Sequence, residues 1–366
     1  MPLNSLLQCL PSPVAGLTGW PWTEETPTEI YASRHDWPRI SIVTPSYNQA
    51  AFLEETIRSV LLQNYPNLQY IVIDGGSTDG SREVIARYAP WLDHWESERD
   101  RGQSHAINKG LSRCNGTWFN WINSDDCLLP GALAAVAAAH RPDALLISGF
   151  EVAGPTLATS VPLGRTKTGP TVEDALVNHF ICQQGMFFRT DAVKARHGVR
   201  EDLHYVMDLE LFADLLLQGG PEAVSVTSAH LAFFRRHVAA KTTLAPEKFF
   251  AEEHRLFAGL GRAAGIDATL LGHLHASEPI EIPKTATARI EPTRLARLLA
   301  KKYWWDGTIE TAWRQRQLGE FRREARAFAQ SFPQVTNRRI SMLHFLARLP
   351  EPLLRFVSQF RAEPQP

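Results

Sequence analysis

Apolar runs alternate with amphipathic segments in the first half of the chain, beyond residue 38. Three short runs rich in β-branched or aromatic residues predict buried strands, at 39–44, 68–74 and 117–122. After the first run, Leu53, Ile57, Val60 and Leu61 recur on one helical face. Further helices are predicted at 79–88, 104–113 and 131–140, and a further strand at 144–148.

Strands that alternate with helices of this length predict right-handed βαβ units. The expected fold class is therefore α/β, with a mostly parallel central sheet flanked by helices and a helical C-terminal extension. Ligands bind such sheets beyond the carboxyl ends of the strands. Polar clusters follow the first three strands: PSYNQ, DGGSTDG and NSDD. Each alone is typical of a turn, but three at one edge favour a shared site.

The rest of the pattern divides the chain into four parts. An irregular arm is expected at 1–38, the main domain at 39–245, a helical extension and linker at 246–290, and a basic helical tail at 291–366. In the later part of the main domain we expect a loop at 152–170, helices at 172–179 and 208–218, and two strands in AVSVTS and HLAFFRRH.

Composition narrows the class of protein. With 366 residues, 44% of them apolar, the chain can bury a full core. A formal net charge of −1 gives no signature of polyanion binding, so no nucleic-acid partner is expected. Four cysteines without a CxxC spacing indicate neither a zinc site nor a disulfide framework. The sequence shows no signal-peptide pattern and no apolar run of roughly 18 residues, and a cytoplasmic location is expected.

Positive charge is concentrated at the C-terminal end. Residues 291–366 hold 14 Lys and Arg against 7 Asp and Glu, a net charge of +7, so the remainder carries −8. The segment Met342–Arg361 combines apolar residues with arginines. One interpretation is peripheral contact with an anionic membrane surface. The other is a helix packed on the main domain or on a second subunit.

Adjacent carboxylates at the end of the third strand suggest a cation site. Asp125 and Asp126 offer the oxygen ligands that Mg²⁺ or Mn²⁺ takes while sharing its shell with a substrate phosphate. Alternatively, one of them caps the helix that begins near Pro130. His237, at the end of a late strand, is either a third ligand or a histidine held by hydrogen bonds.

Five further residues are candidates for the same site. Asp208 begins a predicted helix, where it acts either as a general base in a desolvated cleft or as a helix cap. Tyr47 follows the first strand and either stacks on a planar base or wedges between strand and helix. Lys241, with Arg235 and Arg236, has the charge to hold phosphate oxygens.

Taken together, these segments resemble the family 2 glycosyltransferases, which are inverting enzymes with the GT-A fold. The resemblance extends from Arg39 to Thr242. It is carried by ISIVTPSYNQAAFLEETIRSVLLQNYPNLQYIVIDGGSTDGS, ERDRGQSHAINKGLSRCNGTWFNWINSDDCLLPGAL, CQQGMFFR, HYVMDLELFADLLLQG and FFRRHVAAKT.

The resemblance implies a role for each matched position. It makes Asp208 the catalytic base and places the metal at Asp125, Asp126 and His237. It assigns the nucleotide-sugar pocket to Thr44, Pro45, Tyr47, Asp74, Gln103, Asn108, Asn123 and Asp125.

Two positions depart from the family pattern. Gly75 stands where many members have a second aspartate that contacts the base, which removes the usual ground for assigning uracil. Asn123 replaces the first aspartate of the metal motif, so the site carries one negative charge fewer.

The function implied is that of a metal-dependent hexosyltransferase-type enzyme. It would use Mn²⁺ or Mg²⁺ to move a sugar from a nucleotide-diphosphate donor to a saccharide or lipid-linked acceptor, in polysaccharide, glycolipid or glycan assembly. Two alternatives stay open. One is a degenerate, non-catalytic nucleotide- or carbohydrate-binding relative. The other is a sugar nucleotidyltransferase, which TPSYNQ disfavours because it lacks glycine and Lys or Arg.

Overall fold

The chain divides into two compact units. The computed structural model describes residues 5–13, 15–32, 36–238, 240–274, 276 and 278–359. The first unit comprises Met1–Pro170 and Asn178–Glu252, and the second comprises Thr171–Val177 and Glu253–Pro366. The division therefore falls inside helix α9 (Pro246–Ala263) rather than at residue 245.

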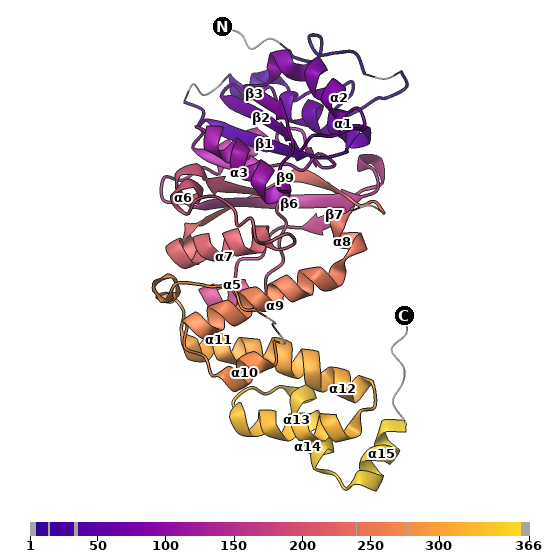
Figure 1. Cartoon of the computed structure of the whole chain (residues 1–366), viewed down its shortest axis with the longest axis vertical. Helices are drawn as coiled ribbons and strands as arrows, with labels where there is room; N and C mark the ends of the chain where they lie inside the picture. Colours follow the sequence, from indigo (N-terminus) through magenta and orange to yellow (C-terminus); the bar gives the residue numbers. More distant parts are fainter. Residues whose placement is uncertain are drawn as a thin grey trace. The chain divides into compact units, whose positions relative to one another are not determined.

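A single mixed sheet forms the centre of the first unit (Figure 1). In the described residues its strand order is β3-β2-β1-β4-β8-β6-β9-β5, and β7 pairs with β6. The strands are β1 Ile40–Ser46, β2 Leu68–Asp74, β3 His94–Ser97, β4 Trp118–Trp121, β5 Cys127–Leu128, β6 Leu146–Gly154, β7 Val161–Gly164, β8 Met186–Arg189 and β9 Val224–Arg235.

The parallel order expected from sequence is present in the first half of the sheet. β3, β2, β1 and β4 are parallel neighbours, whereas β8 runs antiparallel to both β4 and β6. The two strands expected after residue 222 are one, β9. Its register against β6 shifts near Phe150, so the polar residues at 227–229 lie in a bulge that does not end the strand. The expected loop at 152–170 contains the end of β6 and all of β7.

Helices cover both faces of this sheet. The helices are α1 Ala50–Leu61, α2 Ser81–Tyr88, α3 Gln103–Arg113, α4 Ala132–Ala138, α6 Thr190–Ala195, α7 Met207–Gly219 and α8 Lys241–Leu244, with 3₁₀ turns at Ala89–Trp91, Leu157–Thr159 and Pro221–Ala223. Leu53 and Ile57 of α1 share a buried core with Ile42 of β1. α3 packs on the opposite face, where a Cβ on Gly110 would lie 2.5 Å from Val43 Cγ1.

The described part of the N-terminal arm packs on α1. Its regular structure is a 3₁₀ turn, Thr28–Tyr31. The Arg58 guanidinium, fully buried, donates to the carbonyl oxygens of Pro11, Pro21 and Trp22 at 2.8–3.0 Å. Trp20 Nε1 donates to Leu128 O at 2.8 Å. The arm is therefore part of the first unit.

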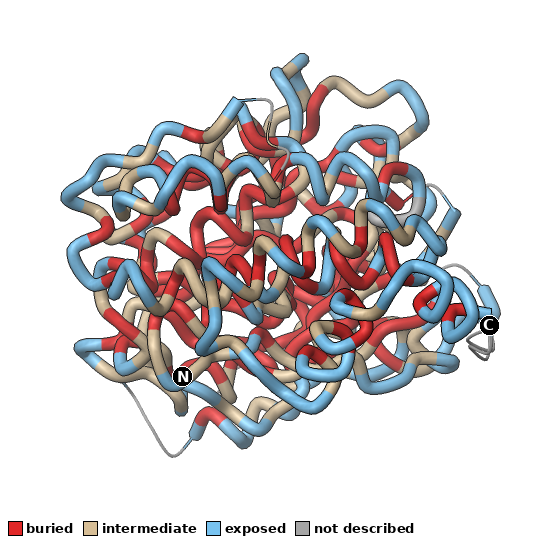
Figure 2. Tube along the Cα trace, turned by 90° about the horizontal axis from the view of Figure 1, so that it is seen from below, coloured by how far each residue is buried: buried red, intermediate tan, exposed pale blue. Residues whose placement is uncertain are grey.

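The second unit is helical. Besides the end of α9 it contains α5 Val172–Val177, α10 Ala268–Gly272, a 3₁₀ turn at Lys284–Thr287, α11 Pro292–Leu299, a π-helical turn at Ala300–Ile309, α12 Glu310–Arg314, α13 Leu318–Ser331, α14 Arg338–Arg348 and α15 Glu351–Gln359. Its core gathers Trp304, Trp305, Trp313, Phe321 and Phe328. Along these helices buried positions alternate with exposed ones (Figure 2).

The C-terminal helices bury one face within this unit. Leu343 of α14 and Leu354 of α15 belong to its core. Met342, Phe345 and Leu353 stay 43%, 62% and 51% exposed. One face of this segment thus packs inside its own unit, and apolar side chains remain outside that packing. No helix among the described residues has the length and apolar character needed to cross a membrane.

Candidate active site

The loops after β1 and β2 meet at the carboxyl edge of the sheet. Ser46, the last residue of β1, pairs in register with Asp74, the last residue of β2. Beyond them, the Asn48 main-chain N–H donates to Ser77 Oγ at 2.8 Å, and Thr78 N donates to Asn48 Oδ1 at 2.9 Å. Two of the polar clusters expected to share a site are therefore bonded to each other.

Within these loops Tyr47 is an exposed large side chain. Its exposed fraction is 64%, whereas Thr44 and Asp74 are fully buried and Pro45 is buried as well. The Thr44 hydroxyl hydrogen-bonds the Tyr70 hydroxyl at 2.9 Å. The Asp74 carboxylate accepts from Gly76 N, Ser77 N, Ser77 Oγ and Ser97 Oγ at 2.5–3.2 Å. Asp74 thus holds the turn after β2, and Thr44 lies beneath the edge.

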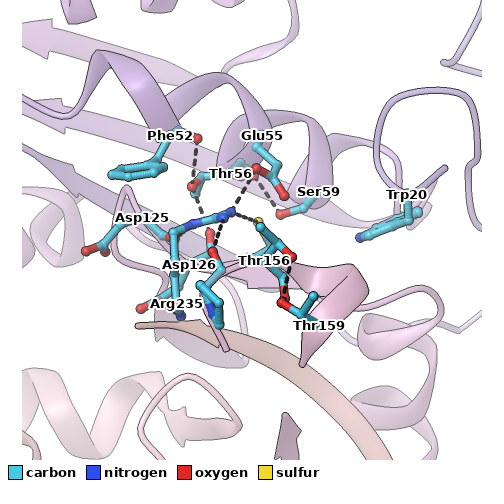
Figure 3. Close-up of polar contacts among 12 residues, drawn as sticks. Trp20, Phe52, Glu55, Thr56, Ser59, Asp125, Asp126, Thr156, Thr159 and Arg235 are labelled. Atoms are coloured by element: carbon cyan, nitrogen blue, oxygen red, sulfur yellow. Dashed lines mark hydrogen bonds and ion pairs between the residues drawn. The ribbon is translucent and has the colours of Figure 1, made fainter. Parts of the chain in front are cut away.

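Arg235, the last residue of β9, holds the loop after β4 in place (Figure 3). The Arg235 main-chain N–H donates to Asp126 Oδ1 at 2.9 Å, and its Nε donates to Asp125 O at 2.8 Å. Its guanidinium pairs with Glu55 of α1 at 2.8 Å and lies 5.0 Å from the ring centroid of Phe52. Arg235 is 5% exposed. It therefore holds this loop and does not face a ligand.

Asp126 points into the protein. Its Oδ2 accepts from Gln184 Nε2 at 2.6 Å and from Asn123 Nδ2 at 3.1 Å, in addition to the bond from Arg235. Burial raises the pKa of Asp126 to about 8, and the neighbouring charge of Asp125 adds to the rise. Both carboxylate oxygens are thus engaged by protein donors.

Asp125 and His237 form the outward-facing pair at this edge. Asp125 Oδ2 lies 2.9 Å from His237 Nε2, and the side chains are 20% and 16% exposed. The imidazole also lies against the Phe52 ring, with centroids 5.0 Å apart. Among the described residues no group of three or more His, Cys, Asp and Glu forms a metal cluster. Two of the three expected metal ligands are therefore adjacent, and the third faces inward.

A chain of amides leads from this loop to α8. Asn123 Oδ1 accepts from Gln103 Nε2 at 2.7 Å, and Gln103 Oε1 accepts from Lys241 Nζ at 2.7 Å. Asn108, also expected in the donor pocket, lies elsewhere. Asn108 Nδ2 donates to Val199 O at 2.8 Å, and Asn108 Oδ1 accepts from Val199 N at 2.9 Å. Asn108 thus anchors the segment that precedes α7.

Asp208 lies in the first turn of α7, and Glu252 holds the segment that precedes this helix. Glu252 of α9 accepts hydrogen bonds from the main-chain N–H groups of His204, Tyr205 and Val206 at 2.7–3.1 Å. These groups belong to the segment that leads into α7, so Glu252 holds that segment in place. Asp208 itself accepts from Leu209 N, one of the free N–H groups of the first turn, at 2.8 Å and stays partly exposed. The helix-capping role considered for Asp208 is therefore compatible with this contact.

The electrostatic environment links Asp208 to the loop after β4. Desolvation raises the pKa of Asp208 to about 6. Burial lowers the pKa of Lys241, while the charges of Glu252, Asp125 and Asp208 act to raise it. Burial raises the pKa of Glu151 to about 8, with the charges of Asp126 and Asp208 adding to the rise. The charges of both aspartate loops thus act on Glu151 and on Lys241.

Three residues of this site were not found from the sequence. Glu252 and Glu151 lie in segments without a motif, and their partners are far away along the chain. Gln184 stands in the matched segment CQQGMFFR, which gave the only hint. Glu151 Oε1 accepts from Gly185 N at 2.6 Å and so holds the segment that brings Gln184 to Asp126.

Comparisons with known proteins find similarity in the first unit of the chain. Residues 41–196 match the family model described as glycosyl transferase family 2. This segment of the chain is thus similar to that family. It contains Tyr47, Asp125 and Asp126, whereas Asp208 and His237 lie beyond it.

Curated relatives share the same segment. TuaG of Bacillus subtilis, named for teichuronic acid biosynthesis, is 36% identical over 92 residues, which are 24% of this chain and 36% of that protein. A PGL/p-HBAD biosynthesis glycosyltransferase of Mycobacterium tuberculosis is 30% identical over 159 residues, 42% of this chain and 59% of that protein. The chain thus spans between about a third and three fifths of these relatives.

Among solved structures, S. aureus TarS residues 1–349 have a TM-score of 0.51 and 18% identity, covering 88% of this chain and 87% of that one. The structure of the same protein in complex with UDP-GlcNAc also has a TM-score of 0.51. This likeness, together with the mixed sheet and its flanking helices, shows a GT-A-like fold.

Replacing Arg235 by Met is expected to destabilise the first unit. The change leaves Glu55 and the Asp125 carbonyl without their buried partner, a loss worth about 3 kcal/mol. Urea unfolding followed by tryptophan fluorescence measures it. The neighbouring Arg236 is exposed, so Arg236→Met is the matched control. Equal unfolding midpoints for the two variants would contradict the role given to Arg235.

Proposed function

We propose that this chain is an inverting glycosyltransferase that moves a sugar from a nucleotide-diphosphate donor to an acceptor hydroxyl. One observation carries the proposal. Lys241 Nζ bonds His204 O, in the segment that leads to Asp208, and it bonds Gln103, whose amide bonds Asn123 in the loop of Asp125. A carboxylate suited to take a proton and a pair suited to hold a cation therefore belong to one site. Similarity of residues 41–196 to glycosyl transferase family 2 supports the reaction class.

The donor set at the edge of the sheet suits a divalent cation. Asp125 Oδ2 and His237 Nε2 are near enough to share one ion and are both partly exposed. A mixed carboxylate and imidazole pair favours Mn²⁺ over Mg²⁺, which prefers oxygen ligands. Bound there, the ion would supply Lewis-acid stabilisation to the departing diphosphate. We assign Asp126 to positioning this loop, because its oxygens are engaged by protein donors.

The remaining steps fall to the protein's own side chains. Asp208 takes the proton of the acceptor hydroxyl as that oxygen bonds to the anomeric carbon and the bond to the diphosphate oxygen breaks. A single displacement of this kind inverts the anomeric carbon. Lys241, held by Gln103, is placed to face the diphosphate charge. Tyr47 is exposed at the end of β1 and offers a ring on which the base can stack.

Asp208→Asn is expected to keep donor binding and to lower kcat by roughly 10²–10⁴-fold, the usual share of general-base help. The base works as the carboxylate, and its pKa is about 6. The kcat/KM of the unaltered protein should therefore be level above that pH and fall roughly tenfold per unit below it. Initial rates of nucleotide release with a panel of nucleotide sugars and Mn²⁺ measure both effects.

The control for Asp208 is Asp143→Asn, which changes a carboxylate that is 76% exposed in the same unit. A near-normal kcat in Asp208→Asn, or a pH profile that stays level below 5, would remove Asp208 from the role. Nucleotide binding without turnover of any sugar would instead favour the non-catalytic relative.

Asp125→Ala and His237→Ala are each expected to weaken Mn²⁺-dependent binding of UDP or GDP roughly tenfold or more, because each removes one ligand of the pair. Calorimetric titration with and without Mn²⁺ measures the loss, and Asp143→Ala serves as the control. Binding that needs no metal in the unaltered protein, or that survives both changes, would contradict the proposed cation site.

We further propose that the protein is cytoplasmic and meets a membrane, where lipid-linked acceptors lie, through α14 and α15. Residues 338–359 carry four arginines and one glutamate, and Phe345 and Leu353 are exposed among them. Basic charge beside exposed apolar side chains suits an anionic lipid surface, where each basic residue contributes about 1 kcal/mol.

The double variant Phe345→Ser/Leu353→Ser is expected to release the full chain from vesicles that contain phosphatidylserine. Both side chains are more than half exposed, so the fold is retained. Co-sedimentation measures the bound fraction, with phosphatidylcholine vesicles and the exposed Val161→Ser of the first unit as controls. Negligible binding by the unaltered protein would end the membrane proposal.

A further inference from the structure

The space above Gly75 is occupied by a carboxylate from another loop. Gly75 follows β2 directly. A Cβ built on it would lie 2.8 Å from Asp100 Oδ2 and 3.1 Å from Asp100 Cγ. The Asp100 carboxylate thus stands where a side chain of residue 75 would begin. Gly75 is required for this approach, because any larger residue would displace Asp100.

The chain brings Asp100 there by extending past the end of β3. Ser97 pairs with Asp74 in register, and Glu98 N donates to Asp74 O at 3.0 Å. The next residues cross the two glycines after β2. A Cβ on Gly76, whose φ is 83°, would lie 3.2 Å from the main-chain nitrogen of Arg99. The close approach of these two loops is therefore built into the sheet edge.

One oxygen of Asp100 is held and the other is free for a ligand. Oδ1 accepts from Gly102 N at 2.8 Å, which fixes the side chain at the start of α3. In the part of the chain that the structure describes, Oδ2 has no hydrogen-bond partner. The side chain is partly exposed. A fixed carboxylate with an open oxygen is an acceptor-only group.

An exposed tyrosine follows the strand residue that bonds Gly75. Gly75 N donates to Ser46 O at 2.8 Å, and the residue after Ser46 is Tyr47. Tyr47 and Asp100 therefore flank the same glycine, one offering a ring face and the other a hydrogen-bond acceptor. A planar base that stacks on the ring would turn its edge to the acceptor.

We propose that Asp100 selects the base of the nucleotide donor. Its Oδ2 accepts a hydrogen bond from a ring N–H, which uracil has at N3 and guanine at N1. Cytosine N3 and adenine N1 are themselves acceptors and would face the carboxylate with a lone pair. The site therefore prefers a donor whose base has a ring N–H, such as a uridine or guanosine diphosphate sugar, over cytidine and adenosine donors. This inference rests on the proposed function and names its donor class.

The test uses Asp100→Asn in the full chain. The substituted amide would keep the bond from Gly102 through its Oδ1 and would place an NH₂ donor where the Asp100 Oδ2 stands. Calorimetric titration with UDP, GDP, CDP and ADP in the presence of Mn²⁺ gives four dissociation constants for each protein. A hydrogen bond to a charged acceptor supports roughly ten- to hundredfold discrimination. We expect the unaltered protein to bind UDP or GDP more tightly than CDP and ADP by that factor. In Asp100→Asn we expect this preference to disappear, because the affinity for UDP or GDP falls and that for CDP or ADP rises.

Methylated nucleotides provide a second measurement that needs no variant. 3-Methyluridine diphosphate and 1-methylguanosine diphosphate lack the ring N–H and should bind the unaltered protein roughly tenfold or more weakly than UDP and GDP. Asp143→Asn should behave as the unaltered protein does.

The outcomes separate the two proposals. If none of the four nucleotides binds the unaltered protein, the proposed function fails and this inference falls with it. If nucleotides bind but CDP or ADP is preferred, if Asp100→Asn leaves the preference unchanged, or if the methylated forms bind as well as their parents, the inference alone is overturned.

Discussion

The buried contact between Arg235 and the loop after β4 is the constraint on which the site depends. One residue at the end of the last strand donates from its main chain to Asp126 and from its side chain to the Asp125 carbonyl, while its charge is balanced by Glu55. Three regions far apart in the sequence are joined in this way. His237 follows two residues later, so the same contact sets the distance between His237 and Asp125. Asp125 and His237 are thus held side by side and partly exposed, while Asp126 and Arg235 beneath them bond to the protein.

Burial also raises the pKa values of carboxyl groups whose environment includes Asp208 or its neighbouring loop. Asp126 and Glu151 lie in surroundings that disfavour their charged forms, and each bonds a neighbouring segment. An acid whose folded pKa is raised makes the fold less stable as pH climbs from its ordinary value toward the raised one. The protein carries this cost at the edge of the sheet where the candidate chemistry lies. Elsewhere in the first unit its core is apolar and closely packed.

Sequence patterns predicted the parts of the fold whose causes are local. The strands β1, β2 and β4 and the apolar face of α1 appear where the spacing of apolar residues placed them. The mixed second half of the sheet was not predicted, because nothing local distinguishes β8 as antiparallel. Neither was the division of the chain inside α9, which depends on Glu252 reaching back to the start of α7.

The candidate site shows the same limit. The motifs named Tyr47, Asp125, His237 and Asp208 as candidates, but they did not distinguish side chains that are open to a ligand from those that hold the loops. Thr44, Asp74, Asn108 and Asp126 proved to be bonded within the protein. The pairing of Gly75 with Asp100 is likewise invisible in sequence, since it arises where β3 runs past β2.

The most direct test of the account is a crystal structure of the protein with Mn²⁺ and UDP or GDP, examined by anomalous scattering. We expect a manganese peak within bonding distance of both Asp125 Oδ2 and His237 Nε2, with the diphosphate bound to the same ion. We expect the Asp208 carboxylate to face the terminal phosphate, to which the sugar of the donor is attached. A nucleotide that binds away from this edge, or a manganese ion held by other residues, would contradict it.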